Sequence, residues 1–142
     1  MKALEQFYSI VNELMRNIYE DEDNKKNIEL GAEKIVAAMT KDELVYVVGP
    51  GGHSNMAAEE CMFRTGRFRC LGPLLDTINL LYGSTKTRML QRLHAYAEGE
   101  LDKYDLKAGN VLIIINAYGM NGLTIELAEK AKLRSIFVIG IA

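Results

Sequence analysis

The chain has 142 residues, of which 49% are hydrophobic, and its formal net charge at pH 7 is −2. This length predicts one domain that buries about two thirds of its unfolded surface. The composition is that of an ordinary soluble protein, and no basic excess is present to hold a nucleic-acid backbone. No apolar run approaches the roughly 18 residues of a membrane span. We therefore expect neither nucleic acid nor a membrane as a partner.

The N-terminal segment and the cysteines point to the cytoplasm. Residues 1–20 carry acidic side chains where a signal peptide would have an unbroken apolar segment. Cys61 and Cys70 are too few for a disulfide framework and have neither a Cys-x-x-Cys nor a paired metal-ligand spacing. We expect a cytoplasmic protein with reduced thiols, no metal site and no cofactor.

Two amphipathic helices are expected before the first strand. The first, over Lys2–Tyr19, has apolar residues at intervals of three and four, which lie on one helix face: Leu4, Phe7, Val11, Leu14, Met15 and Ile18. The acidic cluster at 21–24 can end this helix and cap the next. The second helix has the apolar stripe Ile28, Ala32, Ile35, Val36 and Met39. We expect both stripes to face the core, and a partner subunit is the alternative.

The rest of the chain alternates between strand and helix patterns. Residues 44–48 and 111–115 are continuous apolar runs, typical of strands covered on both faces, and shorter strands are predicted over 68–74 and 135–141. Helices are predicted over 55–64, 85–104 and 123–132, the long one with Leu90, Leu93, Ala97 and Leu101 inward. Gly99 costs that helix roughly 1 kcal/mol relative to alanine, which leaves a break open. The alternation predicts an α/β fold, a three-layer αβα sandwich with a parallel sheet.

The first βα turn is the most informative stretch. Residues 49–55 contain three glycines, whose backbone can turn its N–H groups inward on a concavity that suits an anion. Ser54 stands where the N-cap of the next helix is wanted, and the positive end of that helix would attract a phosphate. We interpret this turn as the floor of a phosphate site. The alternative is a tight βα turn with an ordinary cap.

A second polar turn, residues 116–121, also follows a strand and precedes a helix. In a parallel sheet the carboxyl ends of the strands meet at one edge, so both turns are expected to close on the same ligand.

The order of these motifs resembles the SIS, or sugar isomerase, domain over nearly the whole chain. Gly-His-Ser-Asn-Met-Ala-Ala-Glu-Glu at 52–60 and the segments 101–114 and 125–132 look like a phosphosugar-binding branch of that family. Gly49-Pro-Gly-Gly and Thr65-Gly-Arg-Phe-Arg69 are similar to phosphoheptose isomerase. The resemblance implies a flavodoxin-like fold, a phosphorylated sugar between the two turns, and a homodimer or homotetramer whose subunits complete each other's sites.

The resemblance also assigns candidate site residues. Substrate-binding positions are expected to be Gly51, Gly52, His53, Ser54, Asn55, Asn116, Ala117, Tyr118, Gly119 and Asn121. Where the family usually has two serines in the second turn, this chain has Asn116 and Tyr118. An aldose–ketose isomerase needs a group that moves a proton between carbons, and the candidates here are Glu59, Glu60 and His53. Arg64, Arg67 and Arg69 could reach a phosphate of a neighbouring subunit.

The expected organisation is a single SIS domain over 1–142, with a helical extension at 1–40 and a βα core at 43–142. The chain stops inside the apolar run Phe137–Ala142, so we expect it to be truncated at the C-terminus, where family members continue with another strand and helix. Two other functions stay open. One is a degenerate SIS domain that senses a sugar phosphate or only dimerises; the other, suggested by Gly49-x-Gly51, is a dinucleotide-binding domain.

Overall fold

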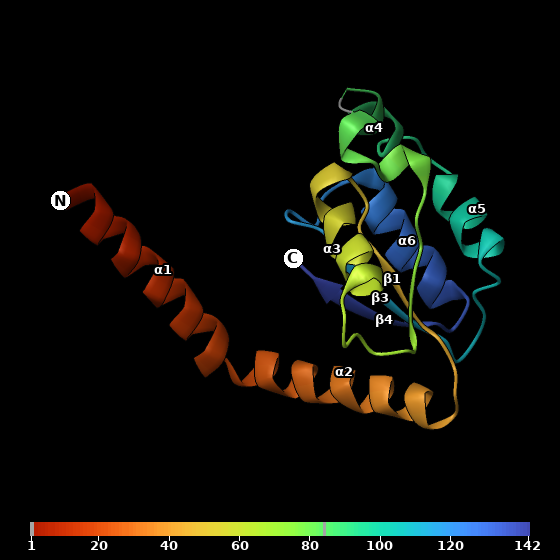
Figure 1. Ribbon diagram of the computed structural model, residues 1–142, viewed down its shortest axis with the longest axis horizontal. Helices are drawn as coiled ribbons and strands as arrows, with labels where there is room; N and C mark the ends of the chain where they lie inside the picture. The colour runs from red at the N-terminus through yellow and green to blue at the C-terminus, as the bar shows by residue number, and fades with distance from the viewer. Residues whose placement is uncertain (1, 84) are drawn as a thin grey trace. The chain divides into compact units, whose positions relative to one another are not determined.

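The computed structural model describes residues 2–83 and 85–142. The chain divides into two compact units, one that ends at Lys34 and one that comprises Ile35–Ala142. The first unit contains helix α1 (Lys2–Glu20) and most of helix α2 (Glu22–Thr40), and the second contains the sheet (Figure 1). Among the described residues, no helix has both the length and the apolar character that crossing a bilayer requires.

The two predicted N-terminal helices are present, but most of the large side chains of their apolar stripes are exposed. Asp21 separates them and caps α2, its Oδ1 accepting the backbone N–H groups of Asp23 and Asn24 at 2.8 and 2.9 Å. None of the described residues of α1 is buried, so the first unit does not cover the stripe of that helix. In α2 the expectation was wrong for the exposed side chains of Ile28, Val36 and Met39. Ile35 instead packs on a small cluster of Ala38, Val45 and Val111.

A four-stranded parallel sheet lies at the centre of the second unit. Its strands are β1 (Val45–Val48), β2 (Leu71–Pro73), β3 (Val111–Ile115) and β4 (Phe137–Ile141), in the order β2-β1-β3-β4. The register pairs Val45 with Val111 and Val111 with Phe137. β1 and β3 are the inner strands, which explains why both are apolar at every position.

The helices cover both faces of this sheet. The connections through α3 (Gly52–Phe63) and α6 (Gly122–Leu133) run in opposite directions from β1 and β3, so right-handed crossovers place them on opposite faces. α5 (Tyr96–Lys103) packs beside α6 (Figure 1). The α/β sandwich with a parallel sheet is therefore confirmed. The main core lies between the sheet and helices α5 and α6. It includes Val48, Leu74, Leu101, Leu112, Leu123 and Leu127, all 0% exposed.

The predicted long helix over 85–104 is two helices, and the break is not at Gly99. α4 (Thr85–Leu90) and α5 are separated by residues 91–95, where Ala95 has a left-handed φ of 67°. Leu93, expected to face inward, is 51% exposed in this break. Gly99 lies within α5, where it costs helix stability without ending the helix. The second strand is also shorter than predicted, because the chain pairs with β1 only from Leu71 to Pro73.

Truncating Leu112 to alanine should lower the free energy of unfolding by about 2–5 kcal/mol, because this inner-strand side chain is 0% exposed and leaves a cavity. Urea denaturation followed by circular dichroism measures the loss. Leu93→Ala, in the exposed break, is the matched control and should change the free energy by about 0.5 kcal/mol or less. Equal losses for the two variants would contradict the assigned core.

Candidate functional site

The two glycine-bearing turns lie together at the carboxyl ends of β1 and β3. These strands are neighbours, and the chain leaves them in opposite directions, so the turns flank the topological switch point of the sheet. Crevices at such points are where open α/β sheets bind ligands. The prediction that both turns share one edge of the sheet is confirmed.

The first turn is built so closely that glycine is required. A Cβ on Gly49 would lie 2.0 Å from the backbone oxygen of Ser54. This clash cannot be relieved by a side-chain movement, because the atom that the Cβ meets belongs to the backbone. Gly51 has a φ of 110°, which favours glycine, and a Cβ there would lie 2.6 Å from Oε1 of Gln91. The turn is thus pressed between its own helix and the segment after α4.

Helix α3 begins three residues earlier than predicted, and Ser54 is not its N-cap. Gly51 occupies that position, without a side-chain hydrogen bond to the helix, and the first intrahelical bond joins Asn55 N to Gly51 O at 2.8 Å. The backbone N–H groups of Gly52, His53 and Ser54 therefore precede that bond and have no acceptor within the helix. They carry the positive end of the helix dipole toward the crevice.

The second turn is fastened to the first by Asn116, which is only 3% exposed. Its Nδ2 donates to the carbonyl oxygen of Pro50 at 2.7 Å, and its Oδ1 accepts the N–H groups of Tyr118 and Gly119 at 3.1 and 2.8 Å. All three hydrogen bonds are within the protein, so the amide of Asn116 joins the two turns. Asn116, at the position where the resemblance predicts a serine, therefore holds the second turn against the first.

Ser54 adds a weaker link between the turns. Its Oγ accepts the N–H of Ala117 at 3.4 Å. Because the hydroxyl acts as an acceptor in that contact, its own proton is free to donate to a ligand.

A cavity of about 560 Å³ opens between the turns and α4. Its lining consists of Pro50, Gly51, Gly52, His53, Ser54, Leu81, Thr85, Thr87, Arg88, Gln91, Arg92, Asn116, Ala117, Tyr118, Met120 and Asn121. This lining includes two arginines and a histidine but no acidic side chain. Neither Arg88 nor Arg92 forms an ion pair within the part of the chain that the structure describes. The cavity therefore favours an anionic ligand.

The sequence prediction missed the contribution of α4. Arg88 lies in α4 and Arg92 lies two residues after its end, and their spacing of four is recognisable in the sequence. Nothing in the sequence indicates that this segment meets the turn at Gly51, because the contact depends on how α4 folds back over the sheet edge. Thr87 helps to fix α4 there, its Oγ1 donating to the carbonyl oxygen of Leu80 at 2.7 Å.

Most of the predicted substrate-binding residues line this cavity, with two exceptions. Asn55 is buried beneath it, and its Nδ2 donates to Oε1 of Glu59 at 2.6 Å. Gly119 instead lines an apolar cavity of about 390 Å³ between α6 and β4. Tyr118 is 80% exposed, so it stands at the rim and does not fill the cavity.

The predicted catalytic residues separate into two groups. His53 lines the cavity, whereas Glu59 and Glu60 do not. Glu59 is held by Asn55, and the exposed Glu60 forms an ion pair with Arg64 one turn further along α3. Arg67 and Arg69 precede β2 at the opposite edge of the sheet and are remote from this chain's own cavity. No cluster of three or more histidine, cysteine or acidic residues that could hold a metal ion occurs among the described residues.

The fold and the site define a class of protein, a flavodoxin-like α/β domain with a crevice at its switch point that is lined by two arginines and a helix N-terminus. The chain belongs to the SIS-domain family, whose model matches residues 6–142. Recognition of that family from the motifs is thus confirmed.

Its relatives include UPF0309 proteins of bacteria. One from Thermoanaerobacter pseudethanolicus is 36% identical over 118 residues, covering 82% of this chain and 48% of that protein. One from Oceanobacillus iheyensis is 30% identical over 141 residues, covering 98% of this chain and 56% of that protein. One from Brucella ovis is 33% identical over 115 residues, covering 80% of this chain and 47% of that protein. The chain therefore spans about half the length of these relatives.

Replacing Asn116 with alanine should lower the free energy of unfolding by about 1–3 kcal/mol, because it leaves the buried carbonyl of Pro50 and two N–H groups without their partner. Thermal and urea unfolding measure the effect. The control is Asn121→Ala, since that side chain makes one long contact of 3.4 Å to Gln91 and its loss should cost about 0.5 kcal/mol or less. If both variants lost the same stability, Asn116 would not be the link between the turns.

Proposed function

We propose that this protein binds a phosphorylated sugar in the cavity between the two turns. The observation that carries the proposal is the composition of that cavity: the first turn of α3 presents N–H groups without an acceptor in the helix, Arg88 and Arg92 add positive charge, and the lining has no acidic side chain. A phosphate suits these donors because they combine a helix N-terminus with cations. Membership of the SIS family supports the same ligand class.

The remaining lining suits a sugar attached to that phosphate. Gln91, Asn121 and His53 offer hydrogen-bonding groups for hydroxyls, and Tyr118 and Met120 offer apolar surface at the rim. Ser54 adds a hydroxyl at the phosphate end. Such a mixture of a few polar groups and apolar walls is typical of small-molecule sites.

Isomerisation of the sugar is the finer proposal, and His53 is its candidate acid or base because it alone of the three predicted catalytic residues lines the cavity. Glu59 and Glu60 face other partners, so a second proton-transferring group would have to come from elsewhere in the whole protein or from a neighbouring subunit. A protein that binds the sugar phosphate without turnover, as a sensor, is the alternative, and the engagement of Asn116 within the protein favours it.

We also propose that the protein assembles as a homodimer or homotetramer. The apolar stripe of α1, which the first unit leaves exposed, supports this proposal. In this organisation residues 1–142 are one SIS domain with residues 1–40 as a helical extension, and the cytoplasm is its proposed location.

A thermal-shift screen tests the ligand class. Ribose 5-phosphate, fructose 6-phosphate and sedoheptulose 7-phosphate should raise the melting temperature, whereas the same sugars without phosphate should not, because they lack the anion. NAD should not raise it either, because its diphosphate is esterified at both ends and offers no terminal phosphate group. A shift with NAD alone would favour the dinucleotide-binding alternative. No shift with any phosphorylated sugar would contradict the proposal.

For the phosphosugar with the largest shift, the double variant Arg88→Ala/Arg92→Ala should weaken binding by roughly 1.5–3 kcal/mol, since hydrogen bonds to charged groups have this strength. Ser54→Ala should weaken it by about 1–3 kcal/mol for the same reason. Isothermal titration calorimetry measures both. Lys107→Ala is the control, because the exposed Lys107 precedes β3, at the end of the sheet away from the cavity, and should leave the affinity unchanged. Unaltered binding in the double variant would remove the arginines from the site.

A further inference from the structure

A buried carboxyl group lies in α5, outside the cavity. Glu100 is 2% exposed, and neither of its side-chain oxygens has a hydrogen-bond partner within the described residues. Burial, followed by the negative charge of Asp76, raises the pKa of Glu100 to about 7. An ionised carboxylate would leave both oxygens without donors, whereas a proton lets Glu100 donate to the adjacent Asp76. The orphaned oxygens are therefore explained by a protonated side chain.

Asp76 has the opposite protonation preference. Burial on its own would raise the pKa of Asp76, but hydrogen bonds from the Ile78 N–H, Tyr96 and Lys103 outweigh burial and lower it. The two carboxyl groups are thus poised as one anion and one acid, a pair whose environments push their pKa values apart.

Two hydrogen bonds connect Asp76 of this pair, through η1, to the turn at Gly51. The Oδ1 of Asp76 accepts the N–H of Ile78 at 3.0 Å and caps the short helix η1 (Thr77–Asn79). Within η1, the Oδ1 of the fully buried Asn79 accepts the N–H of Gly51 at 3.2 Å. Electrostatic interaction thus couples Glu100 to Asp76, and hydrogen bonds connect Asp76 through η1 to Gly51 at the cavity.

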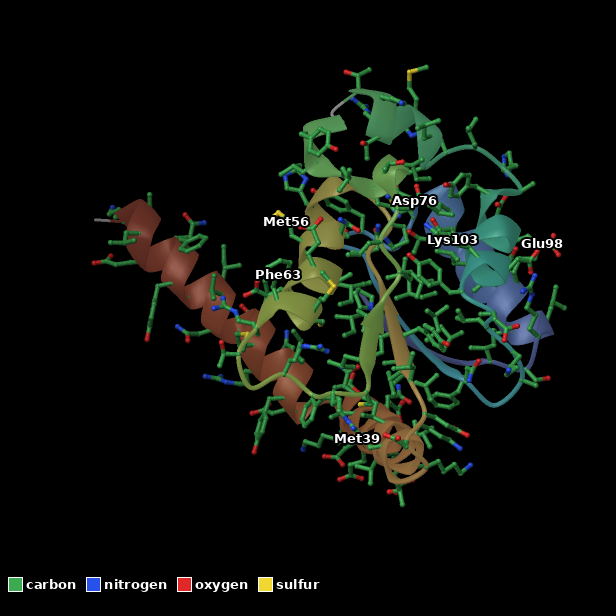
Figure 2. The ribbon with its side chains drawn as sticks, turned by 45° about the vertical axis from the view of Figure 1, so that its right-hand side comes forward. Met39, Met56, Phe63, Asp76, Glu98 and Lys103 are labelled. Carbon is green, nitrogen blue, oxygen red and sulfur yellow. The ribbon has the colours of Figure 1, made fainter. Side chains whose placement is uncertain are left out.

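The other charged groups near the pair cannot replace the proton. The Nζ of Lys103 lies 3.3 Å from Oδ2 of Asp76, but the lysine side chain is 50% exposed. Figure 2 labels both residues. Tyr96 faces the pair, and burial with the hydrogen bond and charge of Asp76 raises the pKa of Tyr96 to about 12. The hydroxyl of Tyr104 is engaged with the backbone N–H and carbonyl of Leu75, each at 3.0 Å. Lys130 of α6 and Arg134, the residue after this helix, are directed elsewhere, because they pair with Glu98 and Asp102 on the exposed side of α5.

We propose that Glu100 is a positioning residue for the ligand-binding turn, whose proton holds Asp76 on η1 and, through Asn79, holds the amide of Gly51. When Glu100 loses this proton, two carboxylates face each other in a buried place, and their repulsion loosens Asp76 from η1. The turn at Gly51 then loses its support. The structure thus links ligand binding to pH through a group that never touches the ligand.

Stability should report the buried proton first. The pKa of Glu100 is higher in the folded chain than its ordinary value of 4.5, so the folded state holds the proton more tightly and its stability falls as pH rises from about 4.5 to about 7. In the parent, the unfolding equilibrium constant should rise by up to about tenfold per pH unit within this window. Glu100→Gln should lack this additional rise. Urea unfolding at pH 5, 6, 7 and 8 measures the difference. Curves that run parallel would overturn the proposal.

Nuclear magnetic resonance of the Gly51 amide tests the coupling without any ligand. In the parent, the Gly51 amide and the carboxyl carbon of Glu100 should titrate together with a midpoint near the pKa of about 7. In Glu100→Gln, whose amide donates to Asp76 at every pH, the Gly51 signal should stay constant. Glu98→Gln, which removes an exposed carboxylate of the same helix, is the control, and its Gly51 signal should titrate as in the parent. A Gly51 signal that does not move in the parent, or moves equally in Glu100→Gln, overturns the proposal.

The consequence for binding rests on the proposed function and is measured separately. Between pH 6 and pH 8, the affinity of the parent for a phosphosugar from the thermal-shift screen should fall about tenfold relative to Glu100→Gln. The comparison removes the titration of the phosphate itself, because both proteins meet the same ligand. If no phosphosugar binds, the proposed function fails while the Gly51 titration still decides the role of Glu100. Equal affinity profiles in the two proteins overturn the coupling to the ligand.

Discussion

The hydrogen bond from Asn116 to the carbonyl of Pro50 is the interaction on which the site depends. It joins the turns that follow the two inner strands, and it exists only because β1 and β3 pair as parallel neighbours with their carboxyl ends together. The same side chain shapes the second turn by accepting the N–H groups of Tyr118 and Gly119. One buried amide thus fixes both the conformation of a turn and its distance from the other. The cavity is the space that this arrangement leaves between the turns and α4.

The electrostatic character of that space contrasts with the chain as a whole. The protein carries a net charge of −2, yet the cavity lining has two arginines and no acidic residue. Acidic side chains close by are directed to other partners: Glu59 to Asn55, and Glu60 to Arg64. The start of α3 adds a dipole of the same sign as the arginines. A local positive field of this kind does not need a basic protein, and it supports the proposed anionic ligand.

Support for the first turn comes from residues that no ligand reaches. Gly51 is held by Asn79, Asn79 lies in η1, and η1 is capped by Asp76, which faces the buried Glu100. The geometry of the turn is therefore sensitive to a proton in the core of the second unit. In this proposal the ligand is held by groups at the cavity surface, whereas the group that responds to pH, Glu100, lies in the interior. Burial there makes the cost of an unpaired charge large.

The sequence by itself determined the strands, the order of helices and the two turns, because apolar runs and glycines act locally. Residues 111–115 were predicted and found as a strand, and the family followed from motifs such as 52–60. The tertiary structure alone decided that α3 starts at Gly52, that the helix expected over 85–104 breaks after Leu90, and that Arg88 and Arg92 join the cavity. It also decided that Glu59 and Glu60 lie outside it. These outcomes depend on contacts between segments distant in sequence, such as Gln91 against Gly51, and local patterns do not encode which segments meet.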